Sequence, residues 1–240
     1  MRWIRFTALA GTLAALMAGA ACGSKPAVTS ESATAKKGLP PLETEPPARL
    51  KVVALGDSIT AGFGVFQIEA YPALLEGKLE AEGYGWDVVN AGESGDTSAT
   101  ALRRVDWVLD PNARILIVAV GGNDALRGIS TRSMHDNIAG IIDKASARGV
   151  DVLLAGMEAP PNLGEDYAMA FRSVFSALKR EYPGIRLMPF LLDGVAGDAN
   201  LNQADGIHPT AAGQQIIANH LYDFLKPMVD DVVSRGSGGQ

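Results

Sequence analysis

The alternation of short apolar runs with helical patterns constrains the fold more than any other feature of this sequence. The apolar runs are predicted strands, and they cover residues 50–55, 86–89, 115–120, 152–155 and 185–188. Segments with apolar residues at helical spacing alternate with them and cover residues 71–82, 98–109, 133–148, 167–182 and 209–229. Such an alternation predicts an α/β fold, in which right-handed crossovers join a parallel sheet with helices on both faces.

Composition and charge exclude several classes of protein. The chain has 240 residues, of which 47% are hydrophobic and 20% charged, so it has enough apolar surface for a core and is not disordered throughout. Its formal net charge of −6 offers no basic surface for nucleic acid, and we expect no nucleic-acid partner. Three histidines and one cysteine exclude a disulfide framework and a cysteine-rich zinc site.

The N-terminal segment has the layout of a secretory signal. Arg2 and Arg5 precede an uncharged apolar run, residues 6–18, which is followed by small residues up to Ala21. The run is shorter than the roughly 20 residues that span a bilayer. We therefore interpret residues 1–21 as a cleaved signal peptide, with an uncleaved N-terminal anchor as the alternative.

The only cysteine, Cys22, follows these small residues directly, as in the lipobox of bacterial lipoproteins. The resemblance implies lipidation of Cys22; cleavage nearby that leaves a free cysteine is the alternative. Residues 22–48 are rich in Ala, Pro, Ser, Thr, Lys and Glu and lack apolar periodicity, so we interpret them as a flexible tether. We expect an exported protein, periplasmic or at the cell surface, with a folded domain over residues 49–229 and a C-terminal tail over residues 230–240.

Three polar and glycine-rich blocks follow predicted strands and a fourth precedes the last predicted helix, all at the end of the sheet where a parallel sheet binds its ligands. The blocks are GDSIT at 56–60, NAGESGDTS at 90–98, GGND at 121–124 and DGIHP at 205–209. Together they contain the residue types of nucleophilic catalysis, because a serine hydroxyl needs a base and an imidazole base needs a carboxylate to orient it. Asp205 and His208 are three residues apart, so that one turn could present both.

The order and spacing of the four blocks resemble those of the SGNH (GDSL-type) hydrolase family. The resemblance covers residues 50–228, and the stretches GGNDALRG and PNLGEDY are most similar to its bacterial esterase, thioesterase, lysophospholipase and arylesterase subgroup. It implies a three-layer α/β/α sandwich with a five-stranded parallel sheet, flavodoxin-like in topology. The G-x-S-x-G elbow of α/β-hydrolases does not occur in the sequence.

The resemblance also implies a role for each matching residue. Ser58 corresponds to the nucleophile, His208 to its base and Asp205 to the acid that orients the base. The oxyanion hole corresponds to the backbone N–H groups of Ser58 and Gly95 and the side-chain amide of Asn123. The expected activity is hydrolysis of acyl or aryl esters, extending to thioesters and lysophospholipids, through an acyl-enzyme.

Other functions and roles remain open from the sequence. A carbohydrate O-acetyl esterase and a non-catalytic lipid- or glycan-binding lipoprotein are the alternative functions. We expect no cofactor, no metal and no obligate protein partner, although Asp205 and His208 could in principle bind a metal if a third ligand joined them. We interpret Asp57 and Asp124 as structural, and the histidines inside predicted helices, at 135 and 220, as surface or packing residues.

Overall fold

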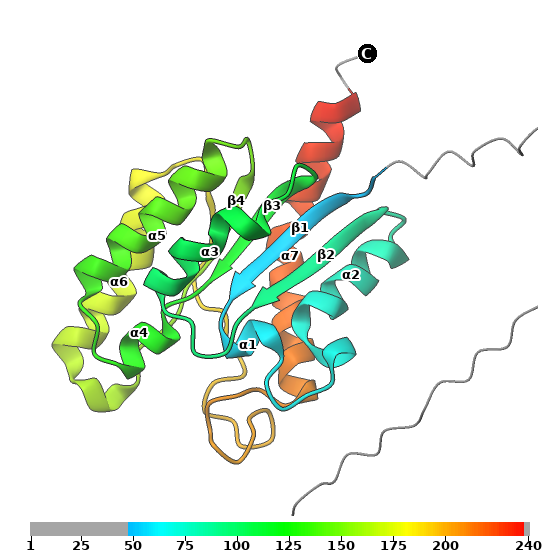
Figure 1. The fold of residues 1–240 in the computed structure, drawn as a ribbon. Coiled ribbons are helices and arrows are strands. Elements are labelled where there is room, and N and C mark those ends of the chain that lie inside the picture. The colour runs from blue at the N-terminus through cyan, green and yellow to red at the C-terminus, as the bar shows by residue number, and fades with distance from the viewer. Residues whose placement is uncertain (1–47, 238–240) are drawn as a thin grey trace, which may run out of the picture. The chain divides into compact units, whose positions relative to one another are not determined.

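The computed structural model describes residues 48–237, which are built around a five-stranded parallel sheet (Figure 1). The strands are β1 (Leu50–Gly56), β2 (Trp86–Gly92), β3 (Ala113–Ala119), β4 (Asp151–Ala155) and β5 (Arg186–Met188). Their order across the sheet is β2-β1-β3-β4-β5, and all four pairings are parallel. The predicted α/β fold with five parallel strands is therefore confirmed.

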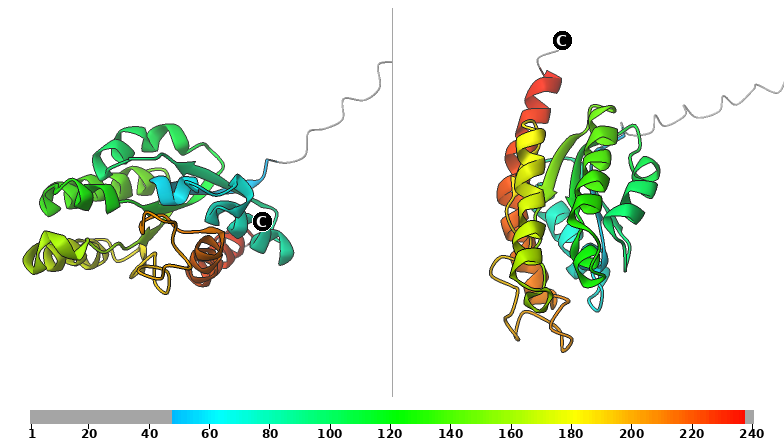
Figure 2. Two further views of the ribbon diagram at one scale, coloured as in Figure 1. Left: turned by 90° about the horizontal axis from the view of Figure 1, so that it is seen from below. Right: turned by 90° about the vertical axis from the view of Figure 1, so that its left-hand side faces the viewer.

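Helices cover both faces of the sheet, as the views in Figure 2 show. They are α1 (Ser58–Ala61), α2 (Tyr71–Ala81), α3 (Ser98–Val108), α4 (Gly122–Leu126), α5 (Thr131–Ser146), α6 (Glu165–Glu181) and α7 (Ala211–Ser237), with short 3₁₀ turns η1 (Gln67–Glu69) and η2 (Pro161–Leu163). Helices α3 and α5 pack together on one face, and α2 and α7 on the other. Helix α6 lies beside α5 and contacts the edge strand β5.

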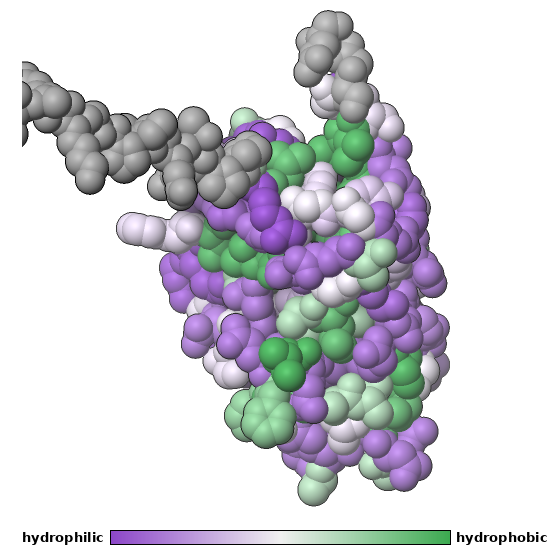
Figure 3. Space-filling model, turned by 90° about the vertical axis from the view of Figure 1, so that its right-hand side faces the viewer, coloured by the Kyte–Doolittle hydropathy of each residue, from purple (hydrophilic) through white to green (hydrophobic). Residues whose placement is uncertain are grey.

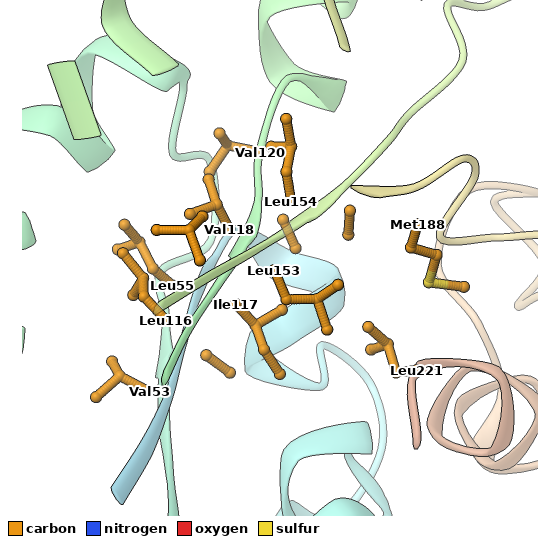
Figure 4. Packing of buried hydrophobic residues seen from close by; sticks show 14 of the residues in the cluster. Val53, Leu55, Leu116, Ile117, Val118, Val120, Leu153, Leu154, Met188 and Leu221 are labelled. Carbon is orange, nitrogen blue, oxygen red and sulfur yellow. The ribbon is translucent and has the colours of Figure 1, made fainter. Parts of the chain in front are cut away.

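The core lies on both sides of the three central strands (Figure 4). Residues 52–55 of β1 and 115–118 of β3 are completely buried, which explains why these strands are apolar without alternation. Leu153 and Leu154 of β4 continue this layer, and Leu221 of α7 closes it from the helical side. The apolar core fills the space between the central strands and the helices. The loops at the carboxyl ends of the strands lie outside this core, where they can form a site.

The C-terminal helix differs from the prediction at both ends. It begins at Ala211 rather than at residue 209, and it continues through Ser237, so the predicted tail over residues 230–240 is wrong for its first eight residues. Two contacts stabilise this extension: Val232 packs against the core, and Arg235 forms an ion pair with Asp151. These contacts are long-range, and composition alone did not indicate them.

The predicted signal peptide over residues 1–21, the predicted lipidation site Cys22 and nearly all of the predicted tether lie outside the described residues. Within residues 48–237, no helix is both long enough and apolar enough to span a membrane. The face shown in Figure 3 is mostly hydrophilic, and its apolar residues form small separate patches.

Candidate active site

Ser58 is placed by a tight turn between β1 and the short helix α1. The strand ends at Gly56, Asp57 caps the helix by accepting the N–H of Ile59, and Ser58 is the first helical residue. A Cβ atom on Gly56 would lie 1.9 Å from the Oγ1 atom of Thr60, so no larger residue fits there without a shift. The turn therefore holds the Ser58 hydroxyl at the carboxyl end of the sheet.

A buried hydrogen-bond network holds α1 against two longer helices. The Thr60 and Tyr71 hydroxyls are 2.8 Å apart, and the side chain of Gln214 on α7 accepts the Tyr71 N–H at 2.9 Å. The same Gln214 side chain donates to the carbonyl of Ile59 at 3.0 Å. Since Thr60, Tyr71 and Gln214 are completely buried, α1 has little freedom to move relative to α2 and α7.

The loop before α7 brings His208 and Asp205 to Ser58. The His208 Nε2 atom is 2.9 Å from the Ser58 Oγ, and its Nδ1 atom is 2.7 Å from the Asp205 Oδ2. The other oxygen, Oδ1 of Asp205, accepts the backbone N–H groups of Ile207 and His208 at 2.9 and 3.0 Å. The structure thus joins three residues, separated by up to 150 positions, in one hydrogen-bonded chain.

The protonation of Asp205 decides which imidazole nitrogen carries the proton. The backbone N–H of His208, the His208 side chain and the N–H of Ile207 lower the pKa of Asp205 to about 2. At neutral pH the carboxylate is therefore ionised and can only accept, so the Nδ1 atom of His208 must be the donor. In neutral imidazole this leaves Nε2 free to accept the proton of the Ser58 hydroxyl.

Two residues that the sequence did not indicate, Phe63 and Gln203, hold the imidazole of His208 and its loop in place. The ring of Phe63 packs on the ring of His208, with 4.6 Å between centroids. The side chain of Gln203 donates to the carbonyls of Phe63 at 2.7 Å and Pro209 at 3.1 Å. These contacts tie the loop after α1 to the loop that carries His208, and they depend on loop packing that leaves no local sequence signal.

The two remaining predicted site residues, Gly95 and Asn123, come from the loops after β2 and β3. Gly95 has a φ of 88°, which favours glycine, and its carbonyl accepts from Arg127 at 2.9 Å. Asn123 lies in the first turn of α4, and its Nδ2 atom is 3.3 Å from the Oδ2 atom of Asp57. The structure brings Gly95 and Asn123 to the same cleft as Ser58 and His208.

That cleft has a volume of about 810 Å³ and a largely apolar wall. Its apolar lining includes Phe63, Leu126, Met157, Leu192 and Ile207. A second depression, of about 900 Å³, lies between β5 and the end of α7 and contains none of the predicted site residues. Of these two depressions, the first is the candidate active site, because it combines the hydrogen-bonded chain with space for an organic substrate.

The side chains interpreted as structural have structural contacts. Asp124 is completely buried and accepts the N–H and the hydroxyl of Ser98 at 2.8 and 2.5 Å. His135 lies on α5 between Asp136 and Glu181, each 3.1 Å away. In residues 48–237, no group of three or more His, Cys, Asp or Glu is placed to hold a metal ion, so Asp205 and His208 have no third ligand there.

A parallel α/β sheet with a Ser–His–Asp chain at its carboxyl edge defines a serine hydrolase, and the comparisons with known proteins identify which kind. Residues 54–216 match the model of the GDSL-like lipase/acylhydrolase family. The chain belongs to this family and is a GDSL-type serine esterase. The family resemblance drawn from the four sequence blocks is thus confirmed.

Named relatives and solved structures agree with this assignment. The chain is 39% identical to "Esterase TesA" of Pseudomonas aeruginosa over 78% of this chain and 94% of that protein. It is 34% identical to "Thioesterase 1/protease 1/lysophospholipase L1" of Escherichia coli K12, over 75% and 85%. A crystal structure of TesA superposes with a TM-score of 0.71 at 40% identity, covering 74% of this chain and 99% of that one. The psychrotrophic esterase EstA from Pseudoalteromonas sp. superposes with a TM-score of 0.70 at 32% identity, covering 75% and 98%.

Proposed function

We propose that this esterase cleaves acyl and aryl esters with apolar acyl groups, and that Ser58, His208 and Asp205 carry the reaction. The observation on which the proposal rests is the hydrogen-bonded chain from Asp205 through His208 to the Ser58 hydroxyl. In this chain the Ser58 hydroxyl contacts a base, the Nε2 atom of His208. The other nitrogen of His208 contacts the ionised carboxylate of Asp205.

In the proposed reaction, the Ser58 Oγ attacks the acyl carbonyl carbon while its proton passes to the Nε2 atom of His208. The negative charge that develops on the carbonyl oxygen is stabilised by the N–H groups of Ser58 and Gly95 and by the amide of Asn123. Cleavage of the bond to the leaving group produces the acyl-enzyme, and His208 returns its proton to the departing oxygen or sulfur. Water then attacks the acyl carbon in the same way and releases the acid and free Ser58.

The wall of the cleft supports an apolar acyl or aryl group as the preferred part of the substrate. Among the lining residues, Phe63 contacts His208 and Ile207 precedes it in the chain, while Leu126 lies on the same short helix as Asn123 and Met157 lies near Gly122. Each buried CH₂ of a substrate gains about 0.8 kcal/mol, so the apolar lining favours chains longer than acetyl. The names of the relatives, which include esterase, thioesterase and lysophospholipase, support extension to thioesters and lysophospholipids.

A series of p-nitrophenyl esters from acetate to palmitate tests the substrate proposal. We expect kcat/KM to rise beyond acetate and to fall only when the chain exceeds the cleft, because added methylenes bury apolar area. Ser58→Ala serves as the blank for spontaneous hydrolysis. Turnover of acetate alone would instead indicate an O-acetyl esterase, and no turnover of any ester would indicate a binding protein.

We also propose that the protein is exported and anchored to a membrane through Cys22. The charged start, the apolar run and the small residues before the cysteine support this proposal, and residues 22–47 are long enough to act as a tether. Stable anchoring would require more than one acyl chain, since a single chain binds only marginally.

Cys22→Ser is therefore expected to move the protein from the membrane fraction to the soluble fraction when expressed in a bacterium. The matched control is Ser24→Ala, which leaves the cysteine in place and should remain with the membrane. Fractionation with immunoblotting measures both. A wild-type protein that is found only in the soluble fraction, with an unmodified N-terminus by mass spectrometry, would contradict the anchor.

A further inference from the structure

Asp57 is a buried carboxylate next to the proposed nucleophile, and the reaction described above does not use it. Its side chain is nearly inaccessible, as the residue is 3% exposed. One oxygen, Oδ1, accepts the N–H of Ile59 at 3.0 Å, which caps α1. The other, Oδ2, accepts from the side-chain amide of Asn123 at 3.3 Å, across 66 positions of sequence.

A charged side chain at position 57 does not stabilise the folded protein. Burial raises its pKa to about 6, against smaller opposite effects of the Ile59 N–H, His208 and Asn123, while Asp96 raises it further. A raised carboxyl pKa means that the ionised form is less favourable in the folded protein than in the unfolded one. Helix capping alone does not require this charge, because serine and asparagine cap helices about as well.

The contact with Asn123 accounts for a carboxylate at this position. An amide side chain can turn over to present either its oxygen or its NH₂ group, and the two orientations have nearly the same shape. An ionised carboxylate only accepts hydrogen bonds, so it selects the orientation in which the NH₂ group faces it. One hydrogen of Asn123 then points to Asp57, and the second remains available to the cleft that Asn123 lines.

We infer that Asp57 is a positioning residue that holds the Asn123 amide with its NH₂ group toward the oxyanion hole. This inference rests on the proposed role of Asn123 as an oxyanion donor. Without Asp57, the amide could present its oxygen to the developing oxyanion and repel it. The expected defect therefore lies in the transition state and appears in kcat rather than in KM.

Two variants separate positioning from capping. In Asp57→Ser the hydroxyl can still accept the Ile59 N–H, but it is too short to serve Asn123 as well. In Asp57→Asn the shape is kept, but one of the two oxygen positions becomes an NH₂ group, so either the Ile59 N–H or the Asn123 amide faces a donor instead of its acceptor. Asp110→Asn is the matched control: Asp110 also accepts backbone N–H groups, those of Asn112 and Ala113, but it lies at the opposite end of the sheet.

We expect Asp57→Ser to lower kcat for p-nitrophenyl butyrate by about 10-fold to 100-fold with little change in KM, below the roughly 10²–10³-fold loss typical of deleting an oxyanion donor. Asp57→Asn should lower kcat in the same direction. Asp110→Asn should lower the melting temperature, because Asp110 also pairs with Lys51, and leave kcat unchanged. Circular dichroism and thermal melts establish that each variant is folded.

The Asn123→Ala background makes the test specific. If Asp57 acts through Asn123, Asp57→Ser should have no further effect on kcat once Asn123 is alanine, which is full coupling in a double-mutant cycle. Full additivity of the two substitutions, or a folded Asp57→Ser variant with wild-type kcat beside an impaired Asn123→Ala, would overturn the inference. If Asn123→Ala itself retains wild-type kcat, the proposed oxyanion role of Asn123 fails, and the inference fails with it while the Ser58 assignment stands.

Discussion

Replacing Ser58 with alanine should abolish ester hydrolysis, with a loss in kcat on the order of 10⁶-fold, the size known for loss of the serine in subtilisin. The hydroxyl is the only group in the His208–Asp205 chain that can form the acyl-enzyme, so its removal leaves binding and the oxyanion donors without a nucleophile. The change is small, and we expect it to cost about 0.5 kcal/mol of stability or less. Steady-state kinetics on p-nitrophenyl butyrate and a thermal melt measure both quantities.

Labelling with a fluorophosphonate gives a second, independent measure of the same prediction. The probe should modify wild-type protein at Ser58, because only a serine in contact with a base is sufficiently nucleophilic. Ser176→Ala is the matched control, since Ser176 is exposed on α6 and bonds only locally to the Ser173 carbonyl. Peptide mapping that finds the label on another serine would contradict the assignment of Ser58.

Asp205→Asn should lower kcat by roughly 10⁴-fold, the loss that the equivalent change causes in trypsin. Asparagine can keep its oxygen on the N–H groups of Ile207 and His208, but its NH₂ group then faces the Nδ1 atom of His208. The imidazole must accept that hydrogen bond at Nδ1, so its proton moves to Nε2. A protonated Nε2 cannot accept the proton of Ser58, and the base is lost although the geometry is kept.

Asp198→Asn is the matched control for this change. Asp198 is an exposed carboxylate in the same long loop, and it accepts the N–H of Asn200 without contacting His208. We expect the kcat of Asp198→Asn to stay near the wild-type value. His208→Ala should lower kcat at least as much as Asp205→Asn does. If Asp205→Asn retained most of the activity, another group would have to orient His208.

The regular part of the fold was predictable because its signals are local. Residues 52–55 of β1 and 115–118 of β3 are buried on both faces of the sheet, and the apolar runs at these positions are the signal from which the strands were predicted. The short helices α1 and α4 were not predicted, since they contain four and five residues and are too short to show helical periodicity. The extension of α7 to Ser237 escaped prediction because it depends on contacts with a distant strand.

The same distinction holds for the site: residues in local sequence blocks were predictable, and contacts between distant residues were not. Ser58 and His208 stand in blocks that parallel-sheet topology brings to one edge, so their proximity could be expected from the order of the elements. Asp57 was interpreted as a turn residue, which its cap on α1 supports, but its contact with Asn123 spans 66 positions and has no sequence signature. The contact between the tilted rings of Phe63 and His208 likewise depends on how two loops pack.

The linkage of α1 to α7 through Gln214 has a consequence for the order in which the protein becomes active during its synthesis. Chains grow from the N-terminus, so a nascent chain that has emerged only through β4 contains Ser58 but neither His208 nor Gln214. Its serine has no base, and the helix that carries the serine lacks its buried partner. With Ser58 and His208 in the roles proposed above, ester cleavage starts only after α7 has packed against α2, and chains interrupted before α7 lack the activity.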